Sequence, residues 1–287
     1  MKQLLEDYYE LAKPRIIFLL LITTGAAMVM AARGVPPLLL TFFTLLGGAL
    51  SAASAGALNC VYDADIDALM RRTVMRPIPR GRISRRDGTI FGIALGILGF
   101  VVLYALVNPL AAWLSLAGNI YYVFVYTMWL KRTTPLNIVI GGAAGAVPPL
   151  VGWAAVTNQI GGPALGLFAL IFLWTPPHFW SLALMTDIDY AKAKIPMLPN
   201  VLGEQRTKLE IFAYTVVLVL ASLALYPLHI MGAMYTAVAA VLGGIFLYDT
   251  VRTWQDDGNT WARKTFRFSL LYLALMCAIM VLDRIIA

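Results

Sequence analysis

Residues 59–86 read NCVYDADIDALMRRTVMRPIPRGRISRR and separate two long apolar runs. Within this stretch Asn59, Asp63 and Asp67 recur every four residues, a spacing that places three oxygen-bearing side chains along one helix face, with a drift of about 40° per step. Asp65 lies off that face. Each flanking run is long enough to cross a bilayer, which takes about 20 residues. The polar stretch is therefore predicted to lie at a membrane surface, at the end of a transmembrane helix.

The same stretch is rich in arginine after its acidic part. The arginines are Arg71, Arg72, Arg76, Arg80, Arg82, Arg85 and Arg86. Guanidinium groups match phosphate oxygens, and two carboxylates with an amide suit Mg²⁺, which prefers oxygen ligands. Together they predict a clamp for a magnesium-bound diphosphate. Each part also has a plainer explanation, because basic loops determine membrane topology and an acidic helix end is often simply solvated.

The composition excludes a soluble globular protein. The chain has 287 residues, of which 60% are hydrophobic and 13% charged, and its mean hydropathy is +0.78. We predict an all-α polytopic membrane protein, a bundle of about nine transmembrane helices forming a single domain over residues 1–287, with residues 1–15 as an interfacial segment. The predicted spans are 16–32, 37–58, 89–107, 110–130, 137–157, 163–183, 211–228, 231–251 and 266–283.

Charge is distributed unevenly between the two sides that these spans define. With a cytoplasmic N-terminus, every Lys and Arg except Arg33 and Arg284 falls on the inner side, as the positive-inside rule expects. The acidic residues also fall on the inner side, with the single exception of Asp283. Because the rule concerns basic residues, the acidic inner face separately indicates a site there. We predict a protein of a bacterial-type inner (cell) membrane, with its N-terminus and active-site loops in the cytoplasm.

A second polar cluster follows the sixth predicted span. Residues 174–179 read WTPPHF, and the two prolines are expected to break or bend the helix and free backbone carbonyls. His178 is an ionisable residue within a span and therefore a candidate functional residue, although it could simply donate to a freed carbonyl. Asp187 and Asp189 arrive about three turns later. On a continuous helix they diverge by about 200°, so at most one of them faces the site.

These motifs resemble a known family. Asn59-xxx-Asp63-xxx-Asp67 followed by Met70-x-Arg72-Thr73-xx-Arg76-Pro77 is similar to the first signature of the UbiA-type intramembrane prenyltransferases, in the form found in the branch that prenylates haem. The second signature of that branch resembles residues 174–179 together with Asp189-Tyr190 and the IPMLP run at 195–199. The LAKPR run at 11–15 and the small-residue run at 137–153 extend the resemblance over nearly the whole chain.

The resemblance implies roles for individual residues. Asp189 is the acid that matches the second motif, whereas Ala193 stands where the wider family often has another acid. Lys192, with Lys194, either contacts the diphosphate or only marks the inner loop. His178 is implied as an axial or orienting haem ligand. The implied catalytic and magnesium-binding residues are Asn59, Asp63, Asp67 and Asp189, and the implied diphosphate-binding residues are Arg72, Arg76, Lys131 and Lys192.

The activity that the resemblance implies is a Mg²⁺-dependent transfer of the farnesyl group of farnesyl diphosphate to a vinyl group of haem B, giving haem O and diphosphate. Haem B is then a substrate rather than a cofactor, and the product would pass to haem A synthase or to terminal oxidase assembly. Two alternatives stay open at this point. The acceptor could be an aromatic quinone precursor, or the chain could be a membrane transporter with broken helices, although a transporter should carry its charges near the bilayer midplane.

Overall fold

The computed structural model describes residues 2–286, with Asp187 described by its backbone alone, and within this range it is built from helices. A π-helical segment, η1, lies between α6 and α7. The elements are α1 (Lys2–Ala12), α2 (Pro14–Ala32), α3 (Leu38–Tyr62), α4 (Ala64–Asp67), α5 (Arg85–Leu106), α6 (Pro109–Ile120), η1 (Tyr121–Leu130), α7 (Lys131–Thr133), α8 (Asn137–Thr157), α9 (Gly162–Lys192), α10 (Leu198–Leu202), α11 (Glu204–Ala224), α12 (Ala233–Gln255) and α13 (Thr260–Ile286).

Within residues 2–286, nine helices are long and apolar enough to cross a membrane, so the predicted integral membrane bundle is confirmed. The fourth of them is continuous from α6 through η1 to α7, at Pro109–Thr133. The seventh and ninth begin earlier than predicted, at Glu204 and Thr260. The first turns of these two helices carry charged residues, so hydropathy alone assigns those turns to loops. The helical hydrogen bonds nevertheless continue through the charged turns.

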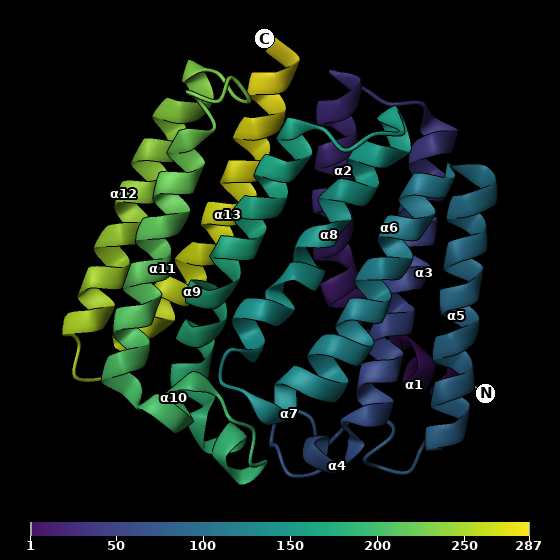
Figure 1. Ribbon diagram of the computed structural model, residues 1–287. Helices are drawn as coiled ribbons and strands as arrows, with labels where there is room; N and C mark the ends of the chain where they lie inside the picture. Colours follow the sequence, from purple (N-terminus) through teal and green to yellow (C-terminus); the bar gives the residue numbers. More distant parts are fainter. Residues whose placement is uncertain (1, 287) are drawn as a thin grey trace.

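The core of the bundle is formed by α8 and α9, which run through its centre (Figure 1). In an apolar 18-residue stretch of each helix, 56% of the residues are buried in α8 and 67% in α9. The corresponding fraction in α5, at the periphery, is 22%. The outward face of α5 carries large exposed apolar residues at helical spacing, including Ile90, Ile93, Ile97 and Val101. Such a surface suits a hydrocarbon solvent, in which apolar side chains need no burial.

The pairing of α3 with α5 depends on glycine. Gly92, Gly96 and Gly99 of α5 face α3, and a Cβ atom on Gly99 would lie 2.9 Å from the carbonyl oxygen of Gly47 and from the amide nitrogen of Ser51. Two backbones approach this closely only when small residues line the contact. The pairing fixes the position of α3, whose lower end in Figure 1 leads into the acidic stretch.

The short helices α4, α7 and α10 gather at one end of the bundle, and the C-terminus lies at the other (Figure 1). The helices that carry the two acidic clusters, α3–α4 and α9, therefore both reach the same end. This arrangement agrees with the sequence-based expectation that the polar residues collect on one face of the membrane domain.

Of the break or bend expected at the proline pair of the sixth span, the break does not occur. Helix α9 continues through Pro176 and Pro177, and the non-helical backbone lies instead at Thr186 (φ −132°, ψ 19°). Within the helix, the Ser181 hydroxyl donates to the carbonyl oxygen of Pro177 at 2.7 Å. Tertiary packing on both sides of α9 compensates for the bonds that proline removes.

Candidate active site

The acidic face at the end of α3 is present and buried. The helical ladder continues across the junction with α4, because the amide of Asp63 donates to the carbonyl of Asn59 at 2.9 Å and that of Asp67 donates to Asp63 at 2.8 Å. The exposed fractions of Asn59, Asp63 and Asp67 are 4%, 0% and 2%. Two carboxylates are thus kept from solvent at one end of the bundle, which requires compensation by positive charge.

Each residue of that face contacts at least one cation, and the closest partners come from different parts of the chain. Lys13 Nζ donates to Asn59 Oδ1 at 2.5 Å, and Arg76 Nη1 binds Asp67 Oδ2 at 2.6 Å. Lys131 pairs with Asp63 through a short contact. The cations come from the α1–α2 junction, the loop after α4 and the start of α7. Three segments distant in sequence therefore meet on one helix face.

Lys13 is a site residue that the sequence analysis did not single out. It has a left-handed backbone (φ 60°), which α1 and α2 on either side hold in place, and a Cβ on Gly56 of α3 would lie 3.2 Å from the carbonyl oxygen of Ala12. Burial lowers the pKa of the Lys13 ammonium below its ordinary value, with the negative charges nearby opposing the change. Its only sequence signal was its place in the LAKPR run.

Asp63 is the most crowded member of the face. Its Oδ2 accepts from Asn59 Nδ2 at 2.8 Å, and Asn59 Nδ2 also donates to Thr127 Oγ1 of η1 at 3.1 Å. Its Oδ1 makes no hydrogen bond within the described residues, although Arg132 Nη2 lies 3.7 Å from it as an ion-pair partner. A buried carboxylate oxygen without a hydrogen bond is available to a ligand.

The acidic face fits a magnesium site in which the protein supplies only a few of the ligands. Among the described residues no group of three or more His, Cys, Asp or Glu lies close enough to hold a metal ion. The face instead offers two carboxylates and an amide oxygen, one carboxylate oxygen having no hydrogen bond. Mg²⁺ commonly takes one or two carboxylates and completes its shell with water and substrate phosphate oxygens, so the donor set is adequate.

The loops after α4 and after α9 pack against each other. Ile66 of α4 and Met70 of the loop after it share an apolar cluster with Tyr190 at the end of α9 and with Ala193 and Ile195 of the loop after α9. The second arginine of the first loop, Arg72, reaches the hydroxyl of Tyr190 with its Nη2, at 3.4 Å. Both motifs that the sequence analysis identified therefore belong to one region.

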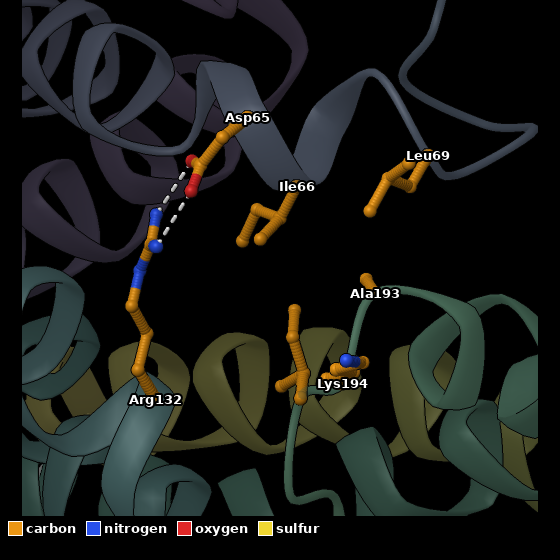
Figure 2. A pocket seen from close by; sticks show the side chains of 7 residues that line it. Asp65, Ile66, Leu69, Arg132, Ala193 and Lys194 are labelled. Carbon is orange, nitrogen blue, oxygen red and sulfur yellow. Dashed lines mark hydrogen bonds and ion pairs between the residues drawn. The ribbon is translucent and has the colours of Figure 1, made fainter.

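A cavity of about 290 Å³ lies between these loops (Figure 2). One wall is an ion pair in which both terminal nitrogens of Arg132 bind the Asp65 carboxylate, at 2.8 and 2.7 Å, and the opposite wall includes Ala193 and Lys194. The hydrogen bonds from Arg132 lower the pKa of Asp65 to about 2. Asp65 therefore pairs with Arg132, whose Nη2 also lies 3.7 Å from Asp63 Oδ1 of the acidic face.

Two predicted site residues have weaker support. Asp189 is half-buried, and among the described residues its carboxylate has neither a hydrogen bond nor an ion pair. Lys192 is exposed. Ala193, which stands where the wider family often has an acid, is 6% exposed and packs in the apolar cluster between the loops. The roles of Asp189 and Lys192 stay predictions.

His178 lies in the aromatic interior of the bundle rather than beside a freed carbonyl. Its Nδ1 is 2.7 Å from Ser269 Oγ of α13. The rings of Trp174 and Phe266 stack on it with centroid distances of 4.1 and 4.7 Å. The simpler expectation, a hydrogen bond to a backbone oxygen near Pro177, does not match these contacts.

The chain is similar to known proteins along most of its length. The model of the UbiA prenyltransferase family matches residues 20–273. A protoheme IX farnesyltransferase of Synechocystis sp. is 52% identical over 283 residues, covering 97% of this chain and 89% of the relative. A protoheme IX farnesyltransferase of Gloeothece citriformis is 51% identical over 286 residues, covering 98% and 88%.

Solved structures share the fold at low identity. A digeranylgeranylglyceryl phosphate synthase superposes with a TM-score of 0.83 at 19% identity, covering 99% of this chain and 100% of that chain. A UbiA homolog from Archaeoglobus fulgidus bound to DMAPP and Mg²⁺ gives 0.69 at 20% identity, covering 96% and 99%. The family match over residues 20–273 and the relatives at about half identity lead to one conclusion: the chain belongs to the UbiA prenyltransferase family.

Proposed function

We propose that this protein transfers the farnesyl group of farnesyl diphosphate to a vinyl group of haem B, in a Mg²⁺-dependent reaction that gives haem O and diphosphate. The observation that carries the proposal is the buried face of Asn59, Asp63 and Asp67, each in contact with at least one cation. Relatives at 51–52% identity named protoheme IX farnesyltransferase support haem as the acceptor. A structural neighbour bound to DMAPP and Mg²⁺ supports the donor class and the metal.

The head group binds at the end of the bundle where the two polar loops meet. Lys13, Arg76 and Lys131, paired with oxygens of the acidic face, donate to the diphosphate, and Arg72 and Lys192 reach it from the loops. Asn59, Asp63, Asp67 and Asp189 are the residues that would hold Mg²⁺, which would stabilise the charge on the departing diphosphate. The farnesyl chain then extends between the helices, where apolar surface receives it.

The protein residues stabilise charge as it moves. When the bond between the farnesyl carbon and the diphosphate oxygen breaks, negative charge grows on the diphosphate, where Arg76 and Lys131 bind it more strongly than in the ground state. The farnesyl cation forms a bond to the terminal vinyl carbon, and water adds to the other vinyl carbon and loses a proton. A dry, apolar cavity protects the cation from water before the carbon–carbon bond forms.

The location follows from the same arrangement. We propose that the polar end of the bundle faces the cytoplasm across a bacterial inner membrane, because basic residues concentrate there. The product haem would then pass within the membrane to haem A synthase or to terminal oxidase assembly.

The test is direct. Membranes containing the protein are incubated with haem B, farnesyl diphosphate and Mg²⁺, and the extracted haem is analysed by mass spectrometry. We expect a mass increase equal to one farnesyl group plus one hydroxyl group, and this product should disappear when Mg²⁺ is chelated. A haem of unchanged mass, with prenylation of an added aromatic acid instead, would overturn the choice of acceptor.

A further inference from the structure

The environment of His178 determines which of its ring nitrogens carries the proton. Ser269 Oγ lies 2.7 Å from the carbonyl oxygen of Phe266 and 2.7 Å from His178 Nδ1. The serine hydroxyl has one proton, and the carbonyl oxygen can only accept. If the hydroxyl donated to Nδ1 instead, two oxygen lone pairs would face each other at 2.7 Å. The serine therefore donates to Phe266 and accepts from the Nδ1–H of His178.

This assignment leaves the other ring nitrogen without a proton. In the neutral imidazole one nitrogen donates and the other carries a lone pair, so Nε2 of His178 carries the lone pair. Within the described residues Nε2 has no hydrogen-bond partner. It is also not among the polar side-chain atoms that lack both a partner and accessible surface. It therefore keeps some accessible surface. No carboxylate among the described residues pairs with this imidazole, so the protonated form has no counter-ion.

The ring is also fixed in orientation. Trp174 and Phe266 stack on the imidazole at interplanar angles of 19° and 24°, and Phe179 contacts it edge-on. Trp174 Nε1 donates to the carbonyl oxygen of Ser269 at 2.7 Å, so the same turn of α13 contacts α9 twice. Ser269 has no exposed surface. Neither ring rotation nor a change of hydrogen-bond partner is possible without disturbing this packing.

We propose that Ser269 is a positioning residue for haem: it fixes His178 as the Nδ1–H tautomer, so that Nε2 presents its lone pair to the haem iron of the acceptor. Metal-binding histidines commonly donate their second ring nitrogen to a fixed acceptor, which sets the tautomer and raises ligand basicity. The inference rests on the proposed function, since it takes haem B as the substrate. It adds to the acceptor site a residue on α13 that is 91 positions from His178 in the sequence.

The test measures haem binding without turnover. Haem B is titrated into the detergent-solubilised full-length protein in the absence of farnesyl diphosphate, and the Soret band gives the affinity and the ligand type. We expect Ser269→Ala to weaken haem binding about 10–100-fold, the usual effect of losing such a partner of a metal ligand, and His178→Ala to remove the histidine-ligated spectrum. Ser269→Thr, which keeps the acceptor oxygen, should restore most of the affinity.

Ser222→Ala is the matched control. Ser222 of α11 has no exposed surface, and its hydroxyl donates to the carbonyl three residues earlier at 2.7 Å, as the hydroxyl of Ser269 does. This variant should bind haem as the wild type does. If Ser269→Ala kept the wild-type affinity and spectrum, or if His178→Ala kept the spectrum, the inference would be overturned while farnesyl transfer to haem could still stand. A wild-type protein that neither bound nor farnesylated haem would overturn both.

Discussion

At the scale of single residues, the site is a set of carboxylate and amide oxygens, each already in contact with a cation. Asn59, Asp63 and Asp67 follow from their spacing in the sequence, because i, i+4 periodicity on a helix is a local property. Their partners do not follow from it. Lys13 is 46 residues from Asn59, and Lys131 is 68 residues from Asp63, so only the packing of separate helices brings each pair together.

Asp63→Ala should abolish prenyl transfer while leaving membrane insertion intact. The variant removes the buried carboxylate that Lys131 and Asn59 contact, and the loss of one electrostatic group at such a site costs on the order of 100-fold or more in kcat. Turnover of farnesyl diphosphate in membranes is the measurement. Asp257→Ala, at an exposed carboxylate on the α12–α13 connection, is the control, and equal activity in the two variants would contradict the assignment.

Arg76→Gln and Arg72→Gln should mainly weaken diphosphate binding. A charge-assisted hydrogen bond contributes about 1.5–3 kcal/mol, which corresponds to roughly 10–100-fold in the inhibition constant of inorganic pyrophosphate. Arg76→Gln should have the larger effect, because Arg76 binds the acidic face directly whereas Arg72 contacts Tyr190. Arg86→Gln, exposed at the start of α5, should match the wild type. Unchanged inhibition constants in both site variants would rule out the clamp.

The lowered pKa of Lys13 should appear in the alkaline limb of the pH profile. Burial favours the neutral amine, so the positive charge is lost at a lower pH than that of a free lysine, and activity that needs the charge should decline there. Arginine keeps its charge throughout this range. The Lys13→Arg variant, assayed from pH 7 to pH 10, should therefore retain activity to higher pH. An identical alkaline limb in both proteins would exclude Lys13 as the source of the decline.

At the scale of helices, close packing places the site. The glycine face of α5 lets α3 approach, and α3 in turn carries the acidic face. The sequence shows the spacing of these glycines, yet it cannot show which helix they contact. Likewise, the proline pair in α9 suggested a break or bend, whereas α9 is continuous there and the non-helical backbone occurs at Thr186.

Gly99→Ala should destabilise the bundle. The added Cβ would lie 2.9 Å from backbone atoms of α3, which cannot move aside as a side chain can, and overpacking of this kind costs about 1–3 kcal/mol. Thermal unfolding in detergent is the measurement. Gly244→Ala in α12 is the matched control, because a Cβ there meets nothing within 4 Å and the helix gains propensity. If Gly99→Ala were as stable as Gly244→Ala, close α3–α5 contact would not be what positions the acidic face.

At the scale of the whole molecule, the nine spans found in residues 2–286 form a bundle with the polar loops at one end and the C-terminus at the other. An odd number of spans places the two chain ends on opposite sides of a membrane. The two native cysteines, Cys60 and Cys277, are both buried. Cysteines introduced at exposed positions can therefore report which side of the membrane each connection faces.

A membrane-impermeant maleimide applied to spheroplasts should label Val35→Cys and spare Asp257→Cys. Val35 is 87% exposed in the connection between α2 and α3, and Asp257 is exposed in the connection between α12 and α13. Asp257→Cys should become labelled after the membrane is permeabilised, which also shows that it is reactive. The reverse pattern would place the acidic face outside the cytoplasm and contradict the proposed orientation.

The membrane class, the number and approximate positions of the spans, and the acidic face could be predicted from the sequence, because hydropathy and helical periodicity are properties of neighbouring residues. The sequence also carried the two motifs on which the family resemblance rests. Only the tertiary structure decided that the two motif loops pack together, that Lys13 joins Asn59, and that Ser269 holds His178. These pairs are 46 or more residues apart, and their contacts exist only because close-packed helices fix side chains from different segments at hydrogen-bond distance.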